Sequence, residues 1–142
     1  MTEVLFYHLH SQPPDRILPG LLEKSLERGW RVAVQAASDE RVEALDALLW
    51  TYRDGEAAAQ PILLTTGEDN PNGATVRFLI DATALPQDAG NYARIVLLFD
   101  GDDPDALSAA RGYWAQAKDR GFDVTYWQPD EQGRWRSVAR DR

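Results

Sequence analysis

The chain has 142 residues, a net charge of -8 at pH 7 and no cysteine. Its length is typical of one domain, which we expect to span residues 1–142. Without cysteine it cannot form disulfides, thiolate nucleophiles or cysteine zinc sites, and its acidic charge argues against direct, tight binding to nucleic acid, because phosphates repel such a surface unless basic residues cluster on one face.

The N-terminal residues lack the order of basic, apolar and small residues that marks a signal peptide. No apolar run approaches the 18 residues or so that a transmembrane helix needs. The absence of cysteine also fits a reducing compartment. We therefore expect a soluble, cytoplasmic protein.

The first strand, helix and second strand are predicted from residues 4–34. Residues 4–9 (VLFYHL) have the length and apolar character of a strand. Asp15 is predicted to cap the following helix, with Pro19 in its first turn, where proline is tolerated. Gly29 is expected to end that helix, and residues 30–34 begin the second strand.

A second helix and two short apolar runs follow. Ser38, three residues before Arg41, has the position of a helix cap, and the helix that it opens carries the carboxylates that make residues 38–60 the most acidic part of the chain. The runs at 61–64 and 75–80 fit either a hairpin with a long loop or two sheet strands joined across the surface. The sequence leaves both arrangements open.

The clearest unit is a strand, a helix and a strand in residues 94–127. Residues 95–99 (IVLLF) form a continuous apolar run, as expected of a strand buried on both faces of a parallel sheet. Asp102 or Asp103 is predicted to cap the helix, and Gly121 to end it before the strand at 122–127. Such a unit predicts a right-handed βαβ crossover between parallel strands.

These elements predict an α/β fold in a single domain: a mostly parallel sheet with helices on both faces, Rossmann-like in topology but without a dinucleotide motif. Residues 134–138 add a short final strand, and residues 139–142 are expected to be mobile.

Most catalytic motifs are missing. The sequence has no GxxxxGK[ST] phosphate loop, no GxGxxG dinucleotide turn and no GxSxG nucleophile elbow. His8 and His10 share one face at the carboxyl end of the first strand, where open α/β sheets often bind ligands. A metal site would need a further ligand that the sequence does not identify, so a pair satisfied by water or backbone is the favoured interpretation, and no cofactor is predicted.

An aspartate cluster offers the one catalytic alternative. Asp100, Asp102, Asp103 and Asp105 follow a buried strand, where carboxylates can hold Mg²⁺ for phosphoryl transfer. The segment FDGDD resembles the aspartate motif of Toprim domains, and Glu68 is the nearest candidate for their second acidic motif. The alternative function is thus a Toprim-like, Mg²⁺-dependent phosphotransfer or nuclease domain using Asp100 and Asp102. The favoured interpretation is that these residues end a strand and cap a helix.

The last helix carries a candidate binding site. Arg111 and Lys118 are two turns apart and project in similar directions, with Trp114 between them. A cation beside an aromatic ring can hold a carboxylate and an apolar group together, as a peptide C-terminus presents them. On the helix alone, a buried Trp114 beside a solvated Arg111 is the simpler interpretation.

Landmarks along the whole chain resemble a known family. They are FYHL at 6–9, LLEKSLERGWRVAV at 21–34, RVEALDALLW at 41–50, PILL at 61–64, RFLID at 77–81, Ala-Arg at 110–111, Gly-Phe at 121–122 and YWQ at 126–128. In this order they resemble the chi subunit of bacterial DNA polymerase III. Two departures are Ala115, where relatives have a lysine, and residues 51–60, which lead to Pro61 without the Phe-x-Pro-His segment of many relatives.

The resemblance implies a non-catalytic accessory subunit of the polymerase III holoenzyme, associated with the clamp loader. It implies binding to the acidic C-terminal tail of single-stranded-DNA-binding protein and, where it is present, to the psi subunit. By resemblance, Arg111 meets the terminal carboxylate of the tail, Trp114 helps to wall the pocket for its last phenylalanine, and Lys118 adds longer-range attraction.

Overall fold

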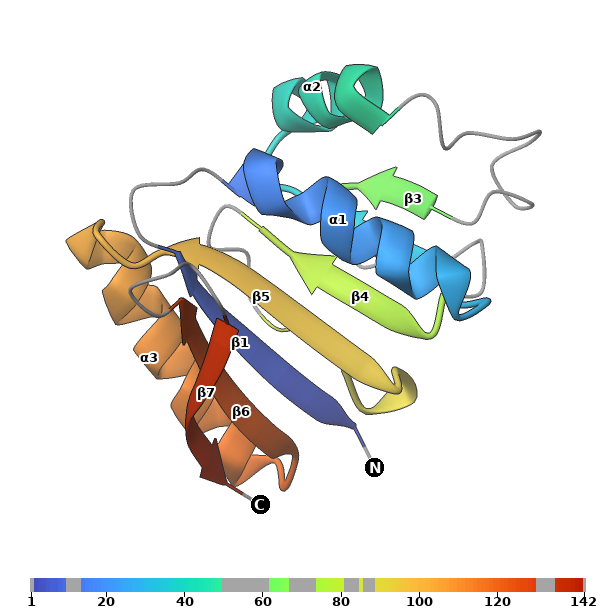
Figure 1. Cartoon of the computed structure of the whole chain (residues 1–142). Helices are drawn as coiled ribbons and strands as arrows, with labels where there is room; N and C mark the ends of the chain where they lie inside the picture. The colour runs from blue at the N-terminus through green and yellow to red at the C-terminus, as the bar shows by residue number, and fades with distance from the viewer. Residues whose placement is uncertain are drawn as a thin grey trace.

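Strands and helices alternate along the chain in the computed structural model, which describes residues 2–9, 14–49, 62–66, 74–80, 85, 89–129 and 135–141. The elements are β1 (Glu3–Leu9), α1 (Pro14–Glu27), β2 (Val32–Gln35), α2 (Asp39–Leu49), β3 (Ile62–Thr65), β4 (Val76–Leu79), the 3-10 helix η3 (Ala89–Asn91), β5 (Arg94–Asp100), α3 (Pro104–Asp119), β6 (Asp123–Pro129) and β7 (Trp135–Asp141). Figure 1 shows their arrangement.

The described strands form one sheet in the order β3-β2-β4-β5-β1-β6-β7. The first six strands along the chain run parallel, and β7 pairs with β6 in the antiparallel direction. All five residues of the apolar run at 95–99 are buried, as expected for a strand between two neighbours in a covered sheet. The predicted α/β fold with a mostly parallel sheet is confirmed.

In the βαβ units built around α1 and α3, the two strands that the helix connects are not neighbours, because other strands lie between them. β5 and β6, which α3 connects, are parallel as predicted, but both pair with β1, which lies between them. Likewise β4 and β5 separate β1 from β2. The N-terminal strand thus lies inside the sheet, with strands on both sides (Figure 1). Its side chains reach both hydrophobic layers.

The two apolar runs in the middle of the chain are sheet strands, not a hairpin. β3 and β4 lie on opposite sides of β2, and each pairs with it in the parallel direction. Ile62 and Val76 are both opposite Val32. Of the two arrangements that the sequence leaves open, the structure therefore has the two separate sheet strands.

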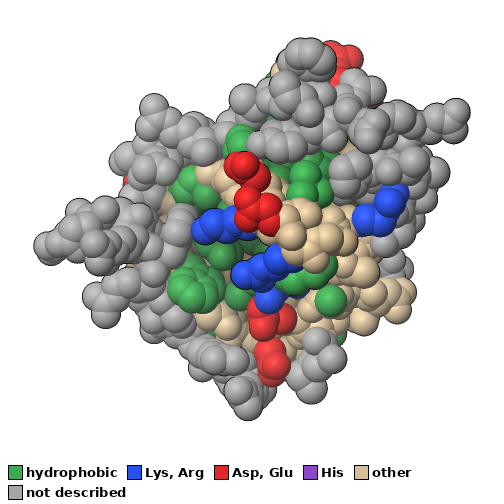
Figure 2. Space-filling model, turned by 45° about the vertical axis from the view of Figure 1, so that its right-hand side comes forward, with side chains coloured by type: hydrophobic (Ala, Val, Ile, Leu, Met, Phe, Trp, Pro, Cys, Tyr) green, Lys and Arg blue, Asp and Glu red, His purple; other side chains and the backbone are tan. Residues whose placement is uncertain are grey.

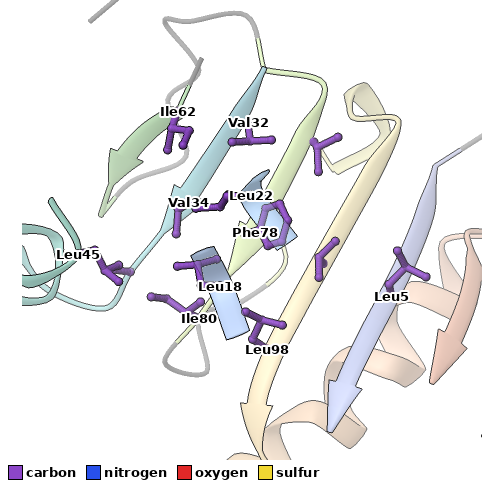
Figure 3. Packing of buried hydrophobic residues seen from close by; sticks show 13 residues of the cluster. Leu5, Leu18, Leu22, Val32, Val34, Leu45, Ile62, Phe78, Ile80 and Leu98 are labelled. Carbon is purple, nitrogen blue, oxygen red and sulfur yellow. The ribbon is translucent and has the colours of Figure 1, made fainter. Parts of the chain in front are cut away.

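Helices cover both faces of the sheet, as predicted. On one face α1 and α2 pack on a cluster that includes Leu18, Leu45 and Val34, and Figure 3 shows these side chains meeting over the strands. On the other face α3 packs through Ala110 and Ala117. The side chains of β1 alternate between the two layers, because successive residues of a strand point to opposite faces.

The capping residues predicted for α2 and α3 are confirmed. The Ser38 hydroxyl accepts a hydrogen bond from the Arg41 N–H at 3.3 Å. Asp103, not Asp102, caps α3, and its carboxylate accepts the Asp105 N–H at 3.0 Å. Gly121 has φ 80°, the left-handed conformation in which glycine avoids the strain of a side chain.

The predicted start of α1 is wrong. The helix begins at Pro14, so Asp15 is its second residue and not its cap. Proline is favoured at the first helical position because its missing N–H has no partner there. Pro19 is consequently the sixth residue, past the first turn, and it cannot donate to the carbonyl four residues earlier.

The C-terminal prediction is also corrected. The expected short strand at 134–138 is β7, and residues 139–141, expected to be mobile, belong to it. Their backbone pairs with β6, with Ala139 opposite Tyr126. This pairing covers an edge of β6 that would otherwise expose backbone groups.

None of the helices in the described part of the chain has the length and apolar character needed to cross a bilayer.

Candidate functional site

The three predicted binding residues lie on successive turns of α3. Arg111 and Lys118 are exposed, whereas Trp114 is half-buried. Ala110 and Ala117 are 4% and 0% exposed and make the contact with the sheet. The small alanines let the helix approach the strands closely, so the larger side chain of Trp114 lies at the border between the core and solvent.

Trp114 packs against aromatic rings from two strands. Its ring centroid lies 5.3 Å from that of Phe6 in β1, with the planes at 59°, and 5.9 Å from that of Tyr126 in β6, at 70°. Tilted and edge-to-face contacts of this kind are the favoured geometries between aromatic rings. The indole is therefore held in one orientation, with part of its surface open to solvent.

Arg111 lies close enough to Tyr126 to act on its ionisation. Burial raises the pKa of the Tyr126 phenol above its ordinary value of 10.0, and the positive charge of Arg111 lowers it in part. Trp114 packs on Tyr126. Arg111 precedes Trp114 by three residues on α3, so a cation and an aromatic surface lie on neighbouring turns of the helix.

His8 belongs to the same layer and is 7% exposed. Its ring lies 5.3 Å from the ring of Phe99, and its Nδ1 atom is 2.5 Å from the Tyr126 hydroxyl. The side chain is therefore packed among aromatic rings with a hydrogen-bond partner. His10 lies outside the described residues. Within the described ranges, no group of three histidine or acidic side chains is arranged to hold a metal ion.

The aspartates after β5 organise the turn into α3. Asp100 accepts the Asp102 N–H at 2.9 Å through its carboxylate, and Asp103 caps the helix. Both carboxylates therefore have the local structural role that the sequence interpretation favours. Glu68, the proposed second half of the Toprim resemblance, lies outside the described residues.

The residue pattern of the last helix does not reveal its contacts with Phe6 and Tyr126. These residues come from strands 120 positions apart in the chain, and the sheet places them opposite each other with rings 6.5 Å apart. The alternation of side chains along a strand places Phe6 and His8 on one face. Only the pairing of β1 with β6 adds Tyr126, so no local pattern in the sequence could have identified the complete cluster.

The comparison with known proteins agrees with the resemblance seen in the sequence. No curated protein matches the chain. Residues 1–125 match the family model described as DNA polymerase III chi subunit, HolC, and this range includes β1, α3 and the residues Arg111, Trp114 and Lys118. The match covers 125 of 142 residues, and the chain therefore belongs to the DNA polymerase III chi subunit family, as an accessory, non-catalytic subunit of DNA replication.

Proposed function

We propose that this chi-family subunit binds the acidic C-terminal tail of single-stranded-DNA-binding protein at the surface formed by Arg111, Trp114 and Lys118. The observation that carries the proposal is the position of Trp114, which is half-buried, fixed by Phe6 and Tyr126, and one helical turn from the exposed Arg111. A tail that ends in an aromatic residue presents the complementary pair, a ring and a carboxylate.

Each residue has a separate task in this proposal. The Arg111 guanidinium donates hydrogen bonds to the terminal carboxylate, for which its planar fork is well shaped. The open part of the Trp114 ring contacts the terminal phenylalanine. Lys118 follows Trp114 by four residues, is also exposed, and attracts the other carboxylates of the tail.

The charge of the whole chain supports an indirect route to DNA. With a net charge of -8, most of the surface repels phosphates. A tail-binding subunit instead reaches single-stranded DNA through the protein that coats it. Within the polymerase III assembly we expect the chain to associate with the clamp loader and, where one exists, with a psi subunit.

A peptide titration tests the proposal. An acidic peptide that ends in proline-phenylalanine should bind, and binding should weaken as salt screens the charges. Amidation of its C-terminus, which removes the terminal carboxylate, should abolish most of the affinity. Arg111→Ala should weaken binding by about tenfold to a hundredfold, the range for a hydrogen bond to a charged group.

Arg120→Ala is the matched control. Arg120 is an exposed cation on the same stretch of chain, but its guanidinium lies 5.0 Å from the ring of Phe122 and outside the proposed surface. Its removal changes the net charge as Arg111→Ala does and should change affinity little. Equal affinity for the free and amidated peptides, or equal losses in both variants, would contradict the proposal.

A further inference from the structure

A hollow of about 230 Å³ opens on the face of the sheet opposite α3. It lies between the C-terminal half of α1 and strands β1, β4, β5 and β6, and its floor includes Phe78 and Val96. Tyr126 and Trp127 are consecutive in β6, so Tyr126 contributes to the α3 layer and Trp127 to this hollow. The two sites are therefore separated by the sheet.

Among the described residues that line the hollow, the charged ones are the cations Lys24, Arg28 and Arg94. Glu3 pairs with Arg94 at 3.2 Å, and both side chains are about one-third exposed. Three positive charges and one negative charge leave two positive charges at the opening. In a chain of net charge -8, the described lining of this hollow carries more cations than acids, and Figure 2 shows Lys and Arg side chains bordering hydrophobic atoms on this face, with Asp and Glu side chains beside them.

The two guanidinium groups converge on one ring. The Cζ atoms of Arg28 and Arg94 each lie 5.0 Å from the ring centroid of Trp30. The arginines come from α1 and β5, and Trp30 precedes β2. Each arginine is therefore held against Trp30 before any ligand arrives, which reduces the entropy lost when an anion binds to it.

The remaining wall of the hollow is aromatic. Tyr7 and Trp127, opposite each other in β1 and β6, stack with ring centroids 6.2 Å apart and planes at 21°. The Trp127 Nε1 atom is buried and has no hydrogen-bond partner among the described residues. An unpaired buried N–H costs free energy, but this atom has almost no solvent-accessible surface and is not open to a ligand in the hollow as it stands.

We propose that this hollow binds a nucleotide, with its phosphate between Arg28 and Arg94 and its base against Tyr7 and Trp127. The ligand must be an anion and must present a planar surface, because the lining offers cations and stacked rings. A dianionic phosphate matches the two uncompensated positive charges, whereas a single carboxylate matches one. The hollow is a local depression of about 230 Å³, which fits one ring and an anionic group but not the length of a helix.

The nucleotide can be free or part of single-stranded DNA, because both present a base beside a phosphate, although the phosphodiester of DNA carries one charge and matches the two cations less well than the dianionic phosphate of a free nucleotide. The acidic surface elsewhere repels neighbouring phosphates, so contact is confined to about one nucleotide and stays weak. This proposal is independent of the tail-binding proposal, since it uses the other face of the sheet.

Nuclear magnetic resonance of the tryptophan indole N–H groups provides the test. Titration with thymidine 5′-monophosphate should move the Trp127 signal, assigned with Trp127→Phe, and leave the Trp114 signal in place. Thymidine and inorganic phosphate should each bind more weakly than the nucleotide. An oligo-dT without a terminal phosphate that moves the same signal would identify DNA as the source; an oligo-dT that does not would identify free nucleotide.

Arg28→Ala should weaken nucleotide binding by about tenfold or more. Arg28→Lys keeps the charge but loses the fork and should give an intermediate loss, and Arg120→Ala should have no effect. Each variant is first shown to be folded by its amide spectrum. The absence of a Trp127 shift at millimolar nucleotide, or unchanged affinity in folded Arg28→Ala, would overturn the proposal.

The acidic tail peptide distinguishes the two sites. It should move the Trp114 signal and lose affinity in Arg111→Ala only. If it moves the Trp127 signal and depends on Arg28 instead, the nucleotide proposal and the assignment of the tail to α3 are both wrong.

Discussion

The imidazole ring of His8 occupies the space in which a Cβ atom at position 101 would stand. The ring is confined by Phe99 and by its hydrogen bond to Tyr126, so it cannot easily move aside. Gly101 is therefore required by the packing of a neighbour and not by a left-handed backbone, which in the described residues occurs at the glycines 29 and 121.

Gly101→Ala should lower the free energy of unfolding by about 1–3 kcal/mol, the usual cost of overpacking a core. Urea denaturation measures this change. In a His8→Ala background the same substitution should cost much less, because the space is empty. An equal cost in both backgrounds would show that the His8 contact is not its cause.

A buried cation, Arg77, joins strands β4 and β2 to Tyr92 through its hydrogen bonds. Arg77 in β4 is 0% exposed, and its guanidinium donates to the Gln35 side-chain oxygen at 3.0 and 2.8 Å and to the Tyr92 hydroxyl at 3.0 Å. Gln35→Leu should lower the free energy of unfolding by about 2–3 kcal/mol, because two hydrogen bonds to a buried charge are lost.

Tyr92→Phe removes one of these hydrogen bonds but keeps the ring against Arg77, so thermal or urea unfolding should show a smaller loss than for Gln35→Leu. A larger loss in Tyr92→Phe would contradict the ranking and would place the main support of the guanidinium at the phenol.

Stability should fall at alkaline pH because of two tyrosines. Burial raises the pKa of Tyr7 and of Tyr126 above 10.0, with the nearby arginines acting in the opposite direction. Above pH 10.0 the unfolded tyrosines lose their protons while the folded ones keep them, so the free energy of unfolding decreases as pH rises toward the folded pKa values. Below that range these groups contribute no pH dependence.

Urea denaturation from about pH 8 to about pH 11 measures this effect. The Tyr7→Phe, Tyr126→Phe variant should lose less stability over that range than the original chain, even if it is less stable at pH 8. A parallel decline in both proteins would assign the alkaline loss to other groups, such as lysines.

Much of the fold is contained in local patterns. The apolar run at 95–99, the caps at Ser38 and Asp103, and Gly121 after α3 act through neighbours within four residues, so the sequence predicts them directly. The prediction from local signals is wrong at Asp15, where proline at the first helical position moved the start of α1 by two residues, from 16 to 14.

The two candidate sites differ in how much of them is local. Arg111, Trp114 and Lys118 share a helix, so their spacing alone brings them together. The cluster of Tyr7, Trp30, Arg94 and Trp127 joins residues separated by up to 120 positions. No periodic pattern in the sequence connects these four residues, and each one by itself has the character of an ordinary core or surface residue.

The sequence alone determined the elements, the α/β class and the helix face with its cation and indole, because these depend on contacts within a few residues. The tertiary structure decided that β1 lies between β5 and β6, and that β3 and β4 flank β2. Strand order depends on which pairings bury both faces of the sheet together, and that free energy belongs to the whole chain, so only the folded sheet brings Phe6 to Trp114 and Trp127 to Arg28 and Arg94.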